Sequence, residues 1–117
     1  KKKKTYKNQG YKQADTNLNT DLTCPSDATL IVKSIYCSNN DASSGILVNM
    51  NLVDSSDSNT EYEFFRDDVA AKTQVNASPQ GINLEAGDSI KIQAATGSNK
   101  IQGVISYAQI DRSQENG

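Results

Sequence analysis

Carboxylates are the side chains of this sequence that could do acid–base chemistry, because the chain contains no histidine. The lack of histidine removes the commonest general base and metal ligand, and it excludes Ser-His and Cys-His nucleophile pairs. A glycosidase needs two carboxylates that face each other across a cleft, and the candidate pairs are Glu61 with Glu63 and Asp67 with Asp68. The first pair lies opposite two aromatic residues of an expected strand, which is typical of solvated charges, and the second stands at a strand end, where acids form turns. We therefore expect a protein that is not an enzyme.

Residues 54–61 (DSSDSNTE) have the oxygen-rich composition of a calcium loop. Asp54, Asp57, Asn59 and Glu61 could supply hard oxygen ligands, but the spacing, central glycine and distal glutamate of an EF-hand are missing, and no helices flank the loop. A plain hairpin loop is the favoured interpretation. The sequence also has no glycine-rich phosphate loop and no zinc-type cysteine spacing, so we expect no metal and no cofactor.

Basic residues are concentrated at the N-terminus. Residues 1–17 hold six lysines and one aspartate, net +5, whereas the remaining hundred residues hold six basic and thirteen acidic side chains, net −7. Such a segment contains too little apolar surface to offset its ordering entropy, so we expect an extended or disordered arm that orders on a partner. The candidate partner-binding residues of this arm are Lys1, Lys2, Lys3, Lys4, Tyr6, Lys7, Tyr11 and Lys12.

Two kinds of partner fit a basic arm that carries tyrosines. Lysines pair with phosphates and tyrosines stack on bases, but the acidic body behind the arm would repel a nucleic-acid duplex. We therefore favour an acidic protein surface over nucleic acid. A solvated terminus that only aids solubility remains the alternative.

The length of 117 residues allows one domain with one core. Apolar residues make up 35% of the chain, below the usual share, which indicates a disordered arm and polar loops, or a core completed by neighbouring subunits. No run of apolar residues is long enough to span a membrane, and nothing resembles a secretory signal, so we expect a soluble protein. We divide the chain into a basic arm (1–17), a sandwich domain (18–111) and a polar tail (112–117).

Residues 81–95 (GINLEAGDSIKIQAA) give the strongest local structural signal. Apolar and polar residues alternate on both sides of the central Glu-Ala-Gly-Asp, and this period of two predicts two strands of one hairpin. Gly87 can take a positive φ in the turn, and the Asp88 side chain can bond to the nearby backbone.

The rest of the chain repeats this strand rhythm. A first strand is expected from residue 18 to 24, and a second, central one from 29 to 38, which is apolar on both faces. A half-buried strand is expected from 46 to 52 and another strand from 60 to 65. A weak strand from 69 to 77 and a last strand from 100 to 110 complete the set. Gly103, on the inward side of the last strand, predicts a bulge or a close backbone approach. About eight short strands and no sustained helical period predict a single antiparallel β-sandwich, of jelly-roll or immunoglobulin-like topology.

Cys24 and Cys37 are the only cysteines. If residues 19–37 form a hairpin that turns near Pro25, the two thiols lie too far apart for a disulfide. Two buried free thiols are the favoured interpretation, and they fit assembly in a reducing cytoplasm.

Several phrases in a fixed order carry a resemblance to a known group. They are LTCP at 22–25, IVKSIY at 31–36 with Asn39, NLVDSS at 51–56, LEAGDSIK at 84–91 and ISY at 105–107. Together they resemble small β-sandwich virion structural proteins of tailed bacteriophages, especially marine and cyanobacterial ones, over residues 18–110.

This resemblance implies a non-catalytic virion component, assembled in the host cytoplasm and present in many copies. It would be a capsid decoration or cement protein that contacts phage capsid or tail proteins through the arm and one sandwich face. The alternatives are an accessory subunit of the neck, tail or baseplate, or a receptor- or sugar-binding module of a tail fibre. Sugar sites generally need exposed aromatic platforms, and the expected inward direction of Tyr62 and Phe64 and the lack of tryptophan argue against a sugar site.

Overall fold

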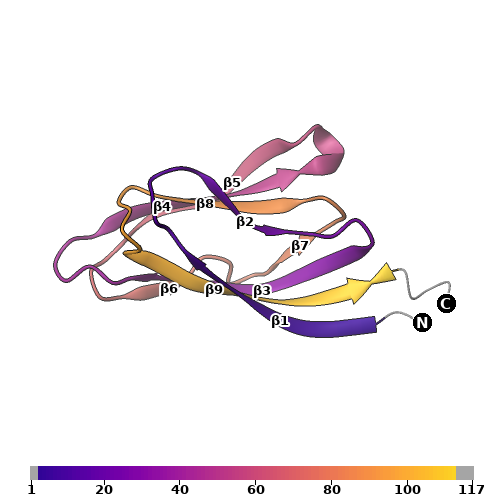
Figure 1. The fold of residues 1–117 in the computed structure, drawn as a ribbon, viewed down its shortest axis with the longest axis horizontal. Coiled ribbons are helices and arrows are strands. Elements are labelled where there is room, and N and C mark those ends of the chain that lie inside the picture. The colour runs from indigo at the N-terminus through magenta and orange to yellow at the C-terminus, as the bar shows by residue number, and fades with distance from the viewer. Residues whose placement is uncertain (1–2, 113–117) are drawn as a thin grey trace.

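The computed structural model describes residues 3–112, which form two antiparallel sheets packed face to face (Figure 1). The strands are β1 (Lys3–Lys12), β2 (Asn19–Thr23), β3 (Ala28–Asn39), β4 (Ile46–Asp54), β5 (Thr60–Val69), β6 (Gln74–Asn76), β7 (Ile82–Leu84), β8 (Ser89–Ala94) and β9 (Ile101–Asp111), with one 3₁₀ turn, η1 (Ser55–Asp57). The predicted β-sandwich is confirmed.

The strand order settles the topology that the sequence left open. One sheet has the order β1-β9-β3-β6, with β7 also paired to β3, and the other has the order β2-β8-β4-β5. The pairs are therefore nested: β1 with β9, β2 with β8, β3 with β6 and β7, and β4 with β5. This is a long hairpin rolled into two sheets, the jelly-roll arrangement.

The core lies between the sheets and is made by alternate residues of each strand. On β3 the inward residues Leu30, Val32, Ile35 and Cys37 are at most 1% exposed. A fully buried aliphatic side chain of this size stabilises the fold by about 1.5–3 kcal/mol. The central position predicted for this strand is confirmed, because β3 has neighbours on both sides.

The predicted hairpin of residues 81–95 is wrong, although its turn chemistry is confirmed. β7 pairs with β3 in one sheet, whereas β8 pairs with β2 and β4 in the other, so the connection crosses the sandwich. Gly87 has φ +83, and the Asp88 carboxylate accepts a 2.9 Å hydrogen bond from the Glu85 amide. The same carboxylate accepts a 2.9 Å bond from the amide of Ser55, which fixes the turn to η1. Alternation reports that a strand has one buried face, but not which sheet the strand joins.

The weak strand predicted over residues 69–77 is also corrected. β5 runs on to Val69, and only Gln74–Asn76 forms a strand afterwards. Between them the backbone turns at Lys72, which has φ +58. Asp67 and Asp68 are tolerated inside β5 because β5 is the edge strand of its sheet, where charged side chains remain in water.

The two cysteines are buried and free, as predicted, but for a different reason. β2 and β3 belong to different sheets, so the hairpin from which the sequence argument started does not exist. Burial raises the pKa of both thiols, which makes them poor nucleophiles.

The expectation of a disordered arm is wrong for the described part of that segment. Residues 3–12 form β1, which pairs with β9 in register from Lys3 opposite Asp111 to Lys12 opposite Gln102. Backbone pairing along ten residues offsets the ordering entropy that the side chains of this segment could not. Lys1 and Lys2 lie outside the described residues, as does most of the predicted tail. Arg112, at the start of that tail, donates hydrogen bonds to the carbonyl groups of Asp27 and Ala28.

Candidate partner-binding face

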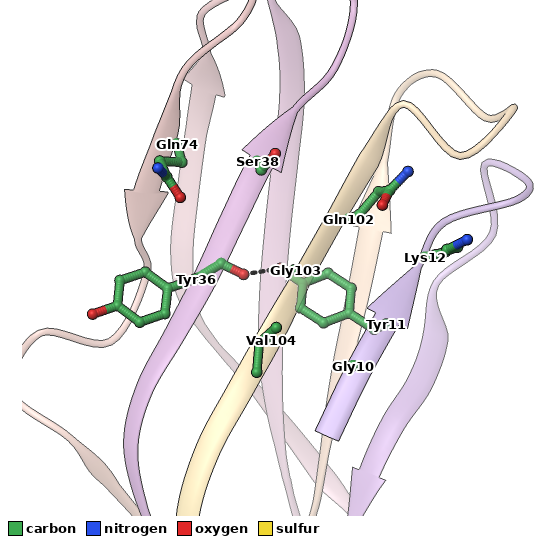
Figure 2. A pocket seen from close by; sticks show the side chains of 9 residues that line it. All are labelled: Gly10, Tyr11, Lys12, Tyr36, Ser38, Gln74, Gln102, Gly103 and Val104. Atoms are coloured by element: carbon green, nitrogen blue, oxygen red, sulfur yellow. Dashed lines mark hydrogen bonds between the residues drawn. The ribbon is translucent and has the colours of Figure 1, made fainter. Parts of the chain in front are cut away.

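One buried tyrosine holds β1 against the sheet. Tyr11 is 6% exposed, and its hydroxyl donates a 2.8 Å hydrogen bond to the Tyr36 carbonyl of β3, across the intervening strand β9 (Figure 2). The ring lies over Gly103 of β9, where the position of a Cβ atom would be 2.6 Å from the Tyr11 hydroxyl oxygen. The close approach predicted at Gly103 is therefore confirmed. Burial raises the pKa of Tyr11, so its hydroxyl stays protonated and remains a donor.

Tyr11, one of the candidate binding residues, is almost fully buried, although it also lines the hollow described below, so its part in binding stays a prediction. Its side chain packs into the core of the sandwich and leaves little surface for a partner. Tyr11 and Tyr6 both stand in a lysine-rich segment, which is why the sequence alone groups them together. In a strand, however, residues five positions apart lie on opposite faces.

The outer surface of the same sheet carries the exposed aromatic and basic side chains, and we call it the basic face. Its outward register positions are Lys4, Tyr6, Asn8, Gly10 and Lys12 on β1, Gln102, Val104, Ser106, Ala108 and Ile110 on β9, Thr29, Ile31, Ser34, Tyr36 and Ser38 on β3, Gln74 and Asn76 on β6, and Asn83 on β7. Every one of these positions, within residues 3–112, is basic or uncharged.

A register shift adds a further lysine to this face. The pairing of β3 with β9 shifts between Val32 and Ser34, so Lys33 is the extra residue of a bulge. Its ammonium group lies 5.2 Å from the centre of the Tyr6 ring, and the ammonium group of Lys4 lies 5.2 Å from the same centre. Two cations thus flank a ring that is 67% exposed, a geometry in which each cation–π contact contributes about 0.5–1 kcal/mol.

Beside this cluster the basic face is hollowed. The hollow, about 650 Å³ in volume, is lined by Gly10, Tyr36, Val104, Gln102, Lys12 and their neighbours. Tyr36 is 48% and Val104 is 40% exposed, so a partner would find apolar contact area here. Figure 2 shows Ser38, Gln74, Gln102 and Lys12 across four strands at one end of the hollow, where their polar groups can bond to a ligand.

Three of the predicted binding residues, Lys4, Tyr6 and Lys12, lie on the basic face. Lys3 and Lys7 point to the other side of β1 but are exposed at its edge. Lys33, Tyr36 and Val104 also lie on this face but were not predicted from the sequence. The signal available for Lys33 was a lysine in the middle of an apolar strand, but the bulge that turns it outward depends on the register of β9.

The two glutamates of the first candidate carboxylate pair, Glu61 and Glu63, are engaged with separate partners. Glu61 accepts hydrogen bonds from Lys91 at 2.8 Å and Asn51 at 3.0 Å, whereas Glu63 forms a bidentate pair with Arg66. These donors lower the pKa of both glutamates, so neither is a proton donor near neutral pH. Tyr62, expected to point inward, is 50% exposed and donates a 2.7 Å bond to Asp57.

The predicted hairpin loop at 54–61 contains the 3₁₀ turn η1. Asp54 accepts hydrogen bonds from the amide and hydroxyl of Ser56. Within residues 3–112 no group of three or more potential metal-binding side chains comes together. In the same residues there is no helix long and apolar enough to cross a membrane.

The sequence matches no protein-family model and no curated protein. Its fold is similar to that of a subunit in a structure described as "Bacillus endospore appendages form a novel family of disulfide-linked pili", with 10% identity over 94% of this chain and 87% of the other, at a TM-score of 0.53. A second similarity is to the virus-like particle of the extra small virus of the giant freshwater prawn Macrobrachium rosenbergii, with 10% identity over 94% of this chain and 79% of the other. Its TM-score of 0.44 does not establish a common fold. The pilus subunit shows that this β-sandwich occurs elsewhere, and the identity is too low to transfer a function.

Proposed function

We propose that this chain is a non-catalytic structural protein of a tailed-phage particle, present in many copies and bound to an acidic patch of the capsid shell through its basic face. The single observation that carries the proposal is the chemistry of that face. Exposed Tyr6, Tyr36 and Val104 lie among Lys4, Lys12 and Lys33, and all the outward register positions are basic or uncharged.

Protein–protein contacts of this kind are stabilised by a few exposed aromatic residues at the centre, while surrounding charges steer the partners together. The rigid sheet keeps these side chains in place before binding, so little ordering entropy is lost. The sequence resemblance to phage virion proteins supports the capsid as the partner. The fold similarity to a pilus subunit is in keeping with a role in a repetitive assembly.

The test is co-sedimentation of the full chain with purified shells of the phage that encodes it. Lys33→Glu and Tyr36→Ala should each reduce occupancy several-fold, because the first reverses a charge on the basic face and the second removes its aromatic contact. Lys91→Glu is the matched control: it makes the same change in charge on the opposite sheet and should leave occupancy unchanged. Unchanged binding of Lys33→Glu and Tyr36→Ala would overturn the proposal.

An accessory position on the neck, tail or baseplate would use the same contact. Electron cryomicroscopy of whole particles distinguishes these positions from the shell, since it locates each copy directly. Density only at the tail would replace the capsid with the tail as the partner.

The hollow beside Tyr36 favours sugar binding as a second candidate function. A half-exposed tyrosine ring provides a surface for a sugar ring, and the carboxamides of Gln74 and Gln102 can bond to hydroxyl groups. Binding on a glycan array that Tyr36→Phe retains and Tyr36→Ala loses would establish this function. An array without signal, together with attachment to shells, would exclude it.

A further inference from the structure

We infer that copies of this chain join head to tail, through antiparallel pairing of strand β1 of one copy with strand β5 of the next. This inference goes beyond binding to a shell, because it concerns the free edges of the two sheets, although Lys4 and Tyr6 of β1 belong to the basic face as well.

The two strands are the long free edges of the sandwich. β1 and β5 have ten residues each, and each is the last strand of its sheet. The opposite edges are shorter, since β2 has five residues, and β6 and β7 have three each. A long free edge presents a row of unpaired amide and carbonyl groups that can pair with another strand.

These edges carry opposite charges. β1 holds Lys3, Lys4, Lys7 and Lys12 and no acid. β5 holds four acids and one arginine. Lysines on an edge can by themselves prevent pairing, but an acidic edge of equal length on the same molecule offers them a partner.

Within β5 the unneutralised charge lies at one end. Glu61 is paired with Lys91 and Glu63 with Arg66. Asp67 and Asp68 are exposed, and within residues 3–112 neither has a cation within 4 Å. These two acids are therefore the natural contacts for lysines of a neighbouring copy.

One antiparallel alignment satisfies both charge and apolar contacts. Placing Lys3 opposite Asp68 puts Lys4 opposite Asp67 and Tyr6 opposite Phe65. Opposite charges and aromatic pairs facing each other across antiparallel strands each stabilise the pairing. Phe65 is only half-buried in a single copy, so it has apolar surface left to cover.

The positions of the edges decide the form of the assembly. β1 runs along one side of the molecule in Figure 1 and β5 lies on the opposite side, in the other sheet. Each pairing therefore leaves one β1 and one β5 free at the ends, and this heterologous contact propagates into a ring or a filament.

The test is sedimentation velocity of the purified full chain over a range of concentrations, at low salt and at about 1 M salt. The expected result is a sedimentation coefficient that rises with concentration at low salt and rises less at high salt. A chain that stays monomeric at every concentration in both salts would overturn the inference.

Charge reversal then locates the contact. Lys3→Glu with Lys4→Glu should weaken self-association about tenfold or more, and so should Asp67→Lys with Asp68→Lys, since each variant places like charges on both edges. An equimolar mixture of the two variants should recover association, and a single chain that carries all four changes should recover it too. A variant that had failed to fold could not associate in the mixture. Recovery would therefore show that each variant is folded and that it lost association because of its edge charges. The inference would be overturned if neither the mixture nor the chain with all four changes recovered association. It would also be overturned if the two charge-reversed variants associated like the parent chain.

The same variants separate this contact from the shell contact. Asp67→Lys with Asp68→Lys should weaken self-association about tenfold or more and leave shell binding intact, while Tyr36→Ala should reduce shell occupancy several-fold and leave self-association intact. Loss of self-association in Tyr36→Ala with no change in the Asp67 and Asp68 variant would place the copy-to-copy contact on the basic face and contradict the edge pairing.

Discussion

The hydroxyl of Tyr11 donates a 2.8 Å hydrogen bond to the main-chain carbonyl of Tyr36, although the two residues lie on strands separated by β9. The ring crosses β9 at Gly103, the residue directly opposite Tyr11 in the register. This bond connects three strands and positions β1, which contributes Lys4, Tyr6 and Lys12 to the basic face.

Tyr11→Phe should destabilise the protein by about 1 kcal/mol, because it removes one buried hydrogen bond and keeps the ring. The measurement is chemical denaturation followed by circular dichroism. Tyr107→Phe is the matched control, since Tyr107 is similarly buried on β9 but takes no part in this bond. Equal losses in the two variants would show that the bond to Tyr36 contributes nothing specific.

Gly103→Ala should be strongly destabilising, by several kcal/mol. The new Cβ would collide with the Tyr36 carbonyl and lie 2.6 Å from the Tyr11 hydroxyl oxygen, so either β1 or β3 has to move. At Gly10, the neighbouring position of β1, the nearest atom to an added Cβ is 3.9 Å away. Gly10→Ala should therefore change the melting temperature little, and a tolerated Gly103→Ala would contradict the described packing of Tyr11.

Asp88→Ala should destabilise the protein by about 2 kcal/mol or more. Its buried carboxylate accepts bonds from the amides of Glu85 and Ser55 and from the Ser55 hydroxyl, all between 2.9 and 3.0 Å. The control is Asp54→Ala, because Asp54 bonds to Ser56 at the exposed end of η1. Thermal denaturation of both variants measures the two losses of stability, and we expect the larger loss in Asp88→Ala. Equal losses would show that the Asp88 contacts contribute little.

Asp21→Asn should remove a pH dependence of stability between pH 4 and 6. Burial raises the pKa of Asp21 to about 6. Its ordinary value is near 4, so between these values the folded chain keeps a proton that the unfolded chain has lost. This contribution to stability is fully present below about pH 4 and is lost as the pH rises through 6.

The asparagine variant keeps a side-chain acceptor for the 3.0 Å bond from Gln13 but does not titrate. It should be more stable than the parent chain at pH 7 and similar to it at pH 4. The comparison must be with the parent chain, because hydrogen bonds that lower the pKa of Asp41 and Glu61 act in the opposite direction. A variant that gains no stability at pH 7 would show that Asp21 is solvated in the folded state.

Alternation along the chain sufficed to predict the sandwich, because period-two burial is a local property of a strand. It predicted the inward residues of β4 and β9 well. On β3 it placed Leu30 and Val32 on the opposite face from Ile35 and Cys37, but the bulge at Lys33 brings all four to the core. Sheet membership was not predictable in this way, and so β7 and β8 were placed in one hairpin when they belong to opposite sheets.

The N-terminal segment is a second case in which the pairing of a strand could not be predicted from the sequence. Its composition predicted disorder, yet Gln13 is fully buried, with hydrogen bonds to Asp21 and to the carbonyl of Ile92. A polar residue can be buried when distant parts of the chain supply its hydrogen-bond partners. The composition of a segment does not reveal such partners. The basic face was only half predicted for this reason, since Lys33, Tyr36 and Val104 join it through the register of β9.

Hydrogen–deuterium exchange of the free full-length chain tests the central claim most directly, namely that residues 3–12 are the first strand of the jelly roll and hold the basic face in place. The account predicts that amides on the β9 side of β1 exchange at least about a hundredfold more slowly than in an unstructured peptide, together with their partners on β9. Exchange across residues 3–12 at the rate of an unstructured peptide would contradict the account and restore a free arm.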